Sequence, residues 1–129
     1  MNKKNVFLVL TVLLFTINGV AQNNIKFNHL TVENGLSQSA VTCIIQDKLG
    51  FMWFGTQDGL NRYDGYPFKV FKNISDDSTS LSDNFIFSIY EDESGTLFIE
   101  TQSGKLNKYN SITETFRVVP NDNINLHKA

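Results

Sequence analysis

Short apolar runs alternate with turn-forming residues along most of the chain, and helical periodicity is absent after residue 21. Residues 47–50 and 92–95 each end on a Gly, where a short hairpin needs a positive φ. Asp58-Gly59 and Ser103-Gly104 are further hairpin signals. The pattern predicts eight short antiparallel strands, over residues 40–47, 51–56, 60–64, 67–73, 85–92, 96–101, 105–110 and 114–119.

The predicted strands form two repeats with a spacing of about 45 residues. A period of this length is typical of β-propeller blades. We therefore predict an all-β fold with two four-stranded antiparallel blades of an incomplete propeller, blade 1 over 35–74 and blade 2 over 75–119. The matching pairs include Leu36/Leu81, Ser37/Ser82, Ile44/Ile89, Asp47/Asp92, Gly50/Gly95, Thr56/Thr101 and Gly59/Gly104.

The inner strands are apolar at consecutive positions, as in residues 52–54 and 97–99. Such strands need cover on both faces, which a blade between two neighbours has. We expect Trp53 to be blade core, although an aromatic ring could also stack on a sugar. The third and fourth strands are more polar, with Asn61 and Arg62 among their residues, as expected of the outer part of a blade.

Residues 1–21 have the order of a secretory signal peptide. Lys3 and Lys4 precede an apolar run over 6–17, and small residues then lead to a cleavage position after Ala21. The run is short for a membrane span, which needs about 20 apolar residues. We expect an exported chain without a membrane anchor; an uncleaved anchor is the alternative. Residues 22–34 are predicted as an N-terminal strand (25–30) and lead-in, and 120–129 as a tail.

The net charge and the cysteine count bear on the classes of partner and cross-link that the chain can have. The chain has 129 residues, 41% of them hydrophobic, and a formal net charge of -2, so no basic surplus favours a nucleic-acid partner. Its single cysteine, Cys43, excludes an intrachain disulfide. Within its predicted strand Cys43 is either a small buried hydrophobe or a thiol that pairs with another chain.

No catalytic, cofactor-binding or metal-binding residue can be named from the sequence. His29 and His127 have no Cys, His or Asp at metal-ligand spacing. Ser37 and Ser82 precede strands without the Gly-x-Ser-x-Gly context of a nucleophile. We expect both serines to cap or brace the loop that leads into an inner strand.

Two further segments partly match the sequence patterns of functional motifs. Residues 76–80 are acidic but lack the ligand alternation and the Gly of a calcium loop, so we expect a solvated inter-blade loop. Asn73-Ile74-Ser75 is formally a glycosylation sequon. Ligand-binding residues stay unknown; if a ligand surface exists, the loops over 33–39 and 75–84 are its candidates.

Several motifs together resemble the two-component regulator propeller repeat: the run 36–47, then 50–56, then 59–65 with Phe68. Residues 30–37 resemble the opening of the periplasmic domain of such sensors. The second repeat departs from the pattern, because Phe98 replaces the Trp and Glu100 replaces the Gly.

The resemblance implies a periplasmic sensor of a hybrid two-component protein, as found in Bacteroides-like bacteria. Many sensors of this family respond to oligosaccharides. We therefore expect an N-terminal fragment of such a propeller, ligand-sensing and without an enzymatic activity or cofactor of its own. The alternatives are a structural or protein-interaction fragment without a ligand, or a fragment of a propeller enzyme acting on glycans. Because propellers close with about 4–8 blades, we expect two blades to depend on further blades or to self-associate.

Overall fold

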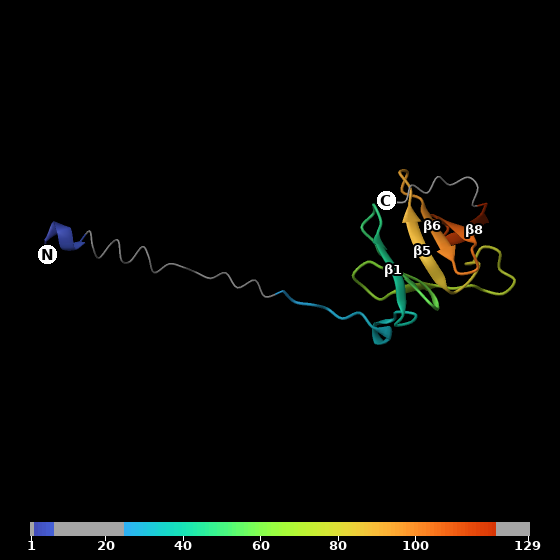
Figure 1. The fold of residues 1–129 in the computed structure, drawn as a ribbon, viewed down its shortest axis with the longest axis horizontal. Coiled ribbons are helices and arrows are strands. Elements are labelled where there is room, and N and C mark those ends of the chain that lie inside the picture. The colour runs from blue at the N-terminus through green and yellow to red at the C-terminus, as the bar shows by residue number, and fades with distance from the viewer. Residues whose placement is uncertain (1, 7–24, 121–129) are drawn as a thin grey trace.

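The computed structural model describes residues 2–6 and 25–120 (Figure 1). Apart from residues 2–6, the predicted leader lies outside the described residues, as do its cleavage position at Ala21 and His127 in the predicted tail. In the part of the chain that the structure describes, no helix is long and apolar enough to cross a bilayer.

The chain folds into two four-stranded antiparallel sheets that follow one another in the sequence, and these are the two predicted blades. The strand orders are β1-β2-β3-β4 in blade 1 and β5-β6-β7-β8 in blade 2. The all-β prediction is confirmed, and each strand begins and ends within about two residues of its predicted bounds. The strands are β1 (Val41–Gln46), β2 (Met52–Thr56), β3 (Gly59–Tyr63), β4 (Lys69–Phe71), β5 (Ile86–Glu91), β6 (Leu97–Thr101), β7 (Leu106–Asn110) and β8 (Thr115–Val119).

An aspartate organises the first hairpin of each blade. The Asp47 carboxylate accepts the backbone N–H of Leu49 at 3.0 Å and of Phe51 at 2.9 Å. Gly50 takes the left-handed conformation, with φ +92°, that the turn requires. Asp92 accepts the backbone N–H of Thr96 in the same way, at 2.8 Å. The recurring Asp-x-x-Gly pattern is therefore the hairpin between the first two strands of a blade.

The second hairpin of blade 1 differs from the prediction by one residue. Thr56 pairs with Gly59 in the ladder between β2 and β3, so the connecting residues are 57–58 rather than Asp58-Gly59. Gly59 instead donates its N–H to the carbonyl of Asn84, at 2.7 Å. Its positive φ of +130° thus serves a contact with the segment entering blade 2.

The strand predicted over 25–30 is wrong. Residues 25–31 have no regular secondary structure, and the 3-10 helix η1 (Val32–Asn34) follows them. Ile25 and Phe27 stay 75% and 80% exposed. A strand needs a neighbour to pair its N–H and C=O groups, and neither described sheet pairs with this segment.

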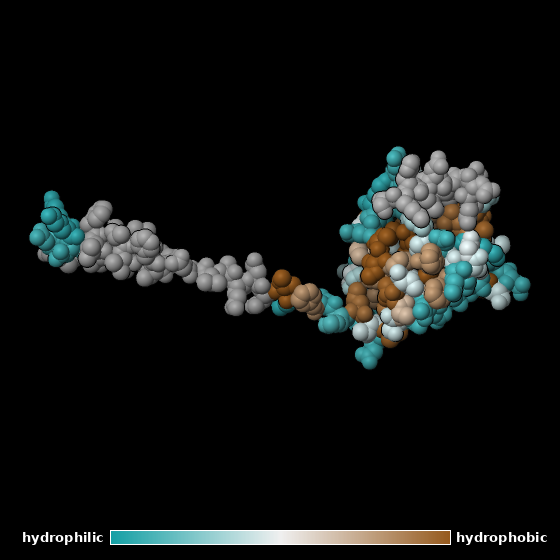
Figure 2. Space-filling model, viewed as in Figure 1, coloured by the Kyte–Doolittle hydropathy of each residue, from teal (hydrophilic) through white to brown (hydrophobic). Residues whose placement is uncertain are grey.

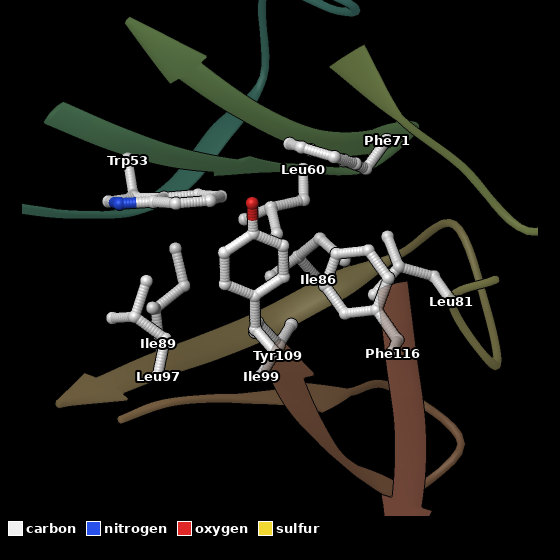
Figure 3. Close-up of a cluster of buried hydrophobic side chains, with 10 residues drawn as sticks. All are labelled: Trp53, Leu60, Phe71, Leu81, Ile86, Ile89, Leu97, Ile99, Tyr109 and Phe116. Atoms are coloured by element: carbon white, nitrogen blue, oxygen red, sulfur yellow. The ribbon is translucent and has the colours of Figure 1, made fainter. Parts of the chain in front are cut away.

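The two blades stack face to face, and the hydrophobic core lies between them (Figure 3). Trp53 is 1% exposed, and its ring centroid lies 5.1 Å from that of Tyr109 in an edge-to-face arrangement. The expectation that Trp53 is blade core is confirmed. The buried core residues are Trp53, Leu60 and Phe71 of blade 1, and Leu81, Ile86, Ile89, Leu97, Ile99, Tyr109 and Phe116 from the segment 81–116.

A glycine allows the close approach of the two sheets. A Cβ atom on Gly55 would lie 2.5 Å from the Sγ of Cys43 and 2.7 Å from a methyl carbon of Ile86. A side chain at this position would force these neighbouring atoms to move. On the other face of β2, Phe54 is half-buried against Phe68, with ring centroids 5.6 Å apart. Strand β2 is therefore covered on both faces, as its apolar run predicts.

Candidate functional site

The loop that enters blade 1 is held by a buried asparagine. Ser37 donates its backbone N–H to the side-chain oxygen of Asn61 at 2.8 Å, and the Asn61 amide donates to the Ser37 hydroxyl at 2.8 Å. The same hydroxyl lies 2.9 Å from that of Thr56. Asn61 is 0% exposed, so it is part of the blade interior and not of a solvated outer edge. The expectation that Asn61 belongs to a polar outer part of the blade is therefore wrong.

The loop that enters blade 2 repeats this arrangement. Ser82 donates its N–H to the side-chain oxygen of Asn107 at 3.0 Å, and the Asn107 amide donates to the Ser82 hydroxyl at 2.9 Å. The expectation that both serines brace a loop is confirmed by these contacts. Reasoning from polarity missed the two asparagines, although both follow a Leu at the start of a third strand. Their recurrence was the signal that could have found them.

The loop over 75–84 borders an open surface pocket of about 660 Å³. Asp77 accepts hydrogen bonds from the backbone N–H and the hydroxyl of Thr79, and these bonds lower the pKa of the Asp77 carboxyl. Among the described residues, no group of three or more His, Cys, Asp or Glu could hold a metal ion. The loop over 33–39 is anchored at its centre by Leu36, which is 6% exposed.

A cleft of about 460 Å³ opens between the blades at the end where β1 turns into β2. The indole N–H of Trp53 donates to Asp47 at 2.7 Å beside it. Arg62 crosses the cleft: its guanidinium donates to the hydroxyl of Tyr109 at 3.2 Å and pairs with Glu114 at 3.0 Å. These contacts tie β3 of blade 1 to β7 of blade 2 and to the turn that follows it.

A group of three charged side chains, those of Arg62, Lys69 and Glu114, lies beside this cleft. Glu114 also pairs with Lys69, and this hydrogen bond, assisted by Arg62, lowers the pKa of the Glu114 carboxyl. Burial raises the pKa of the Tyr109 phenol. The arrangement is that of an electrostatic link between blades, with the Trp53 ring facing the core rather than offering a face to a sugar.

The other candidate residues stand apart from this cleft. His29 is exposed in the segment before η1. Cys43 is half-buried against the core, and burial raises the pKa of its thiol, as fits a small hydrophobe. The side-chain amide of Asn73 donates to the Leu81 carbonyl at 2.6 Å. An open apolar surface runs along β1 and β5, where Ile44 and Phe87 are 53% and 60% exposed (Figure 2).

Comparison with known proteins agrees with the blade architecture. Residues 35–58, which span the loop into blade 1 and its first hairpin, match the family model described as two component regulator propeller. This stretch of the chain is thus similar to that repeat family. The matched stretch contains three residues with structural roles described above. Ser37 is held by Asn61, Asp47 organises the first hairpin, and Gly55 lies where the two sheets approach closely.

A curated relative is a protein named histidine kinase P4 from Formosa agariphila. It is 49% identical over 78 residues, which cover 57% of this chain and 6% of that protein. The chain therefore spans a small part of this relative's length.

Solved structures with the same fold are extracellular domains from B. thetaiotaomicron. One, assigned to a hybrid two component system, is 38% identical with a TM-score of 0.63, over 74% of this chain and 14% of that one. Another, also assigned to a hybrid two component system, is 29% identical with a TM-score of 0.54, over 70% of this chain and 13% of that one. The two blades thus have the fold of propeller regions in such extracellular domains.

Proposed function

We propose that this chain supplies the first two blades of a periplasmic sensor propeller in a hybrid two-component system, with an oligosaccharide as the ligand class. The carrying observation is that the stacked blades share 38% identity and a TM-score of 0.63 with the extracellular domain of such a system. In this proposal the chain recognises a ligand and has no catalytic step of its own.

Sequence beyond the second blade supports a propeller with more blades. Leu126 follows Leu81 at the same spacing by which Leu81 follows Leu36, and both of the earlier leucines are buried lead-in residues. Leu126 itself lies outside the described residues. In this proposal Leu126 marks the start of a third repeat.

Export belongs to the same proposal. The order of basic, apolar and small residues over 1–21 is that of a signal peptide, and the similar structures are extracellular domains. In this proposal cleavage after Ala21 leaves Gln22 as the first residue of the exported chain.

A domain-exchange experiment tests the proposed function. Residues 25–119 replace the matching segment in the 38% identical B. thetaiotaomicron system, and a transcriptional reporter records the response to neutral, uronic-acid and sulfated oligosaccharides. We expect the chimera to signal in response to at least one glycan. A chimera carrying Gly55→Leu, which prevents the close approach of the blades, should be silent. A chimera that is exported and protease-resistant, yet responds to no glycan that activates the parent, contradicts the proposal.

A further inference from the structure

The contact between blades 1 and 2 shows how neighbouring blades of this fold pack. We use it as the template for a blade that would pack on an outer face. In that contact, Gly55 of β2 leaves room for the side chain of Ile86, which enters from β5. Cys43 and Ile45 of β1 are both packed against the same core. The face that blade 1 turns toward the next blade is therefore apolar around this glycine.

Blade 2 carries different chemistry at the three equivalent positions. Glu100 pairs with Ser88 in the ladder just as Gly55 pairs with Cys43, and Tyr90 pairs with Phe98 as Ile45 pairs with Trp53. One carboxylate oxygen of Glu100 accepts hydrogen bonds from the Ser88 hydroxyl at 2.8 Å and the Tyr90 hydroxyl at 3.3 Å.

This polar group lies on the outer face of blade 2. Ile89 and Ile99 point into the core between the blades, and side chains alternate along a strand. Their neighbours Ser88, Tyr90 and Glu100 therefore point away from blade 1. We call these three residues the Glu100 cluster.

A second copy of this chain does not fit over the Glu100 cluster in the geometry of the template. The residue of blade 1 equivalent to Ile86 is Val41, which is 38% exposed. Val41 would meet the Glu100 side chain at the place where Ile86 meets a glycine without a Cβ. Repetition of the same contact is thus blocked by bulk.

Charge adds a second requirement. None of the ion pairs among the described residues includes Glu100, and the two donors of the cluster bind the same oxygen. Lys108 on the adjacent strand lies instead over the Phe98 ring, with its Nζ 5.9 Å from the centroid. A sheet that covers this carboxylate without a cation would bury an unpaired charge, which folded proteins avoid.

We infer that the outer face of blade 2 binds a further β-sheet blade that presents a Lys or Arg side chain to Glu100, at or beside the position that Ile86 occupies in the template. The occupant is thus a blade with a basic contact residue and not a second copy of this chain. The inference goes beyond ligand sensing, because it concerns how the blade stack continues.

The chain itself provides a probe for this face. The donor is the full chain with Val41→Arg, which places a cation at the Ile86-equivalent position, combined with Glu100→Gln to prevent self-stacking. The acceptor is the wild-type chain, labelled with a fluorophore. Sedimentation velocity of the mixture should show a one-to-one complex that weakens as salt is raised. Replacing the acceptor by its Glu100→Gln variant should raise the dissociation constant at least about tenfold, or about 1.4 kcal/mol.

Two matched donors distinguish charge from size. A donor with Val41→Gly removes bulk without adding charge, and one with Val41→Leu adds apolar bulk. Neither should bind the wild-type acceptor as tightly as the Val41→Arg donor does. Equal binding by the glycine donor, or equal binding of the arginine donor to both acceptors, would overturn the inference. So would head-to-tail association of the wild-type chain alone. Circular dichroism confirms that each variant is folded.

Discussion

Replacing Trp53 by alanine perturbs the centre of the inter-blade core. The indole is 1% exposed, packs against both Phe71 and Tyr109, and donates to Asp47. Truncation of a buried Trp costs about 3–5 kcal/mol, because the lost contacts are not recovered when the cavity relaxes. Part of that cost is the hydrogen bond to a carboxylate, worth about 1.5–3 kcal/mol.

The assay is urea unfolding followed by circular dichroism. With a slope of about 1.5 kcal/mol per M for a domain of this size, the midpoint should fall by roughly 2–3 M. If the stability of this domain lies at the lower end of the usual range, near about 5 kcal/mol, the variant would then be close to unfolding in buffer.

Trp53→Phe is an intermediate perturbation. It keeps an aromatic ring in the core but removes the donor to Asp47 and part of the indole volume, so its midpoint should lie between those of the wild type and the alanine variant. If Trp53→Ala left the midpoint unchanged but abolished oligosaccharide binding, Trp53 would be a ligand platform and the core assignment would be refuted.

Four further outcomes are expected. Gly55→Ala should lower the free energy of unfolding by about 1–3 kcal/mol, because its Cβ overlaps the neighbouring blade; equal midpoints in urea would contradict the close approach. Ser37→Ala and Ser82→Ala should each cost about 1–3 kcal/mol in the same assay, since each removes a hydrogen bond to a buried asparagine amide, and a cost at only one site would show that the braces are not equivalent. The lowered pKa of Glu114 stabilises the folded chain above the pKa of the unfolded carboxyl, and this stabilisation is lost as the pH falls through the folded pKa. Glu114→Gln should therefore lessen the loss of thermal stability between about pH 7 and pH 3. A loss of the same size in the variant and the wild type would exclude this contribution of Glu114. N-terminal sequencing of the exported protein should begin at Gln22, whereas Met1 retained in the membrane fraction would indicate an uncleaved anchor.

The blade architecture could be predicted because its information is local and repeated. The first hairpin of each blade depends on an Asp and a Gly close together in the sequence, and the same pair recurs in the second blade. Strand bounds followed from these turns. The strand predicted over 25–30 failed because its apolar residues need a pairing partner, and no described sheet provides one.

The polar interior was not predictable from hydropathy. Asn61 and Asn107 are polar residues in short strands, yet each is 0% exposed, because the lead-in serine returns over the sheet and satisfies it. This contact joins residues 24 or 25 positions apart. Only the coincidence of Ser and Asn in both repeats could have indicated that they meet.

The departures of blade 2 from the repeat have a physical meaning that the sequence alone did not reveal. Phe98 and Glu100 replace a Trp and a Gly, and this weakened the expected likeness of the two blades. In the structure the backbone ladder is unchanged, with Ser88 paired to Glu100 as Cys43 is to Gly55. The substitutions alter only the side chains on the outer face.

Blades built on one backbone pattern can therefore carry different outer faces. A stack in which every face was apolar could continue with any blade or with another copy of itself, which favours misassembly. A glycine at position 55 admits Ile86, whereas a carboxylate at position 100 excludes an apolar side chain of that size and requires a cation. The order of blades in the stack can thus be encoded by a single position in the second strand of each blade.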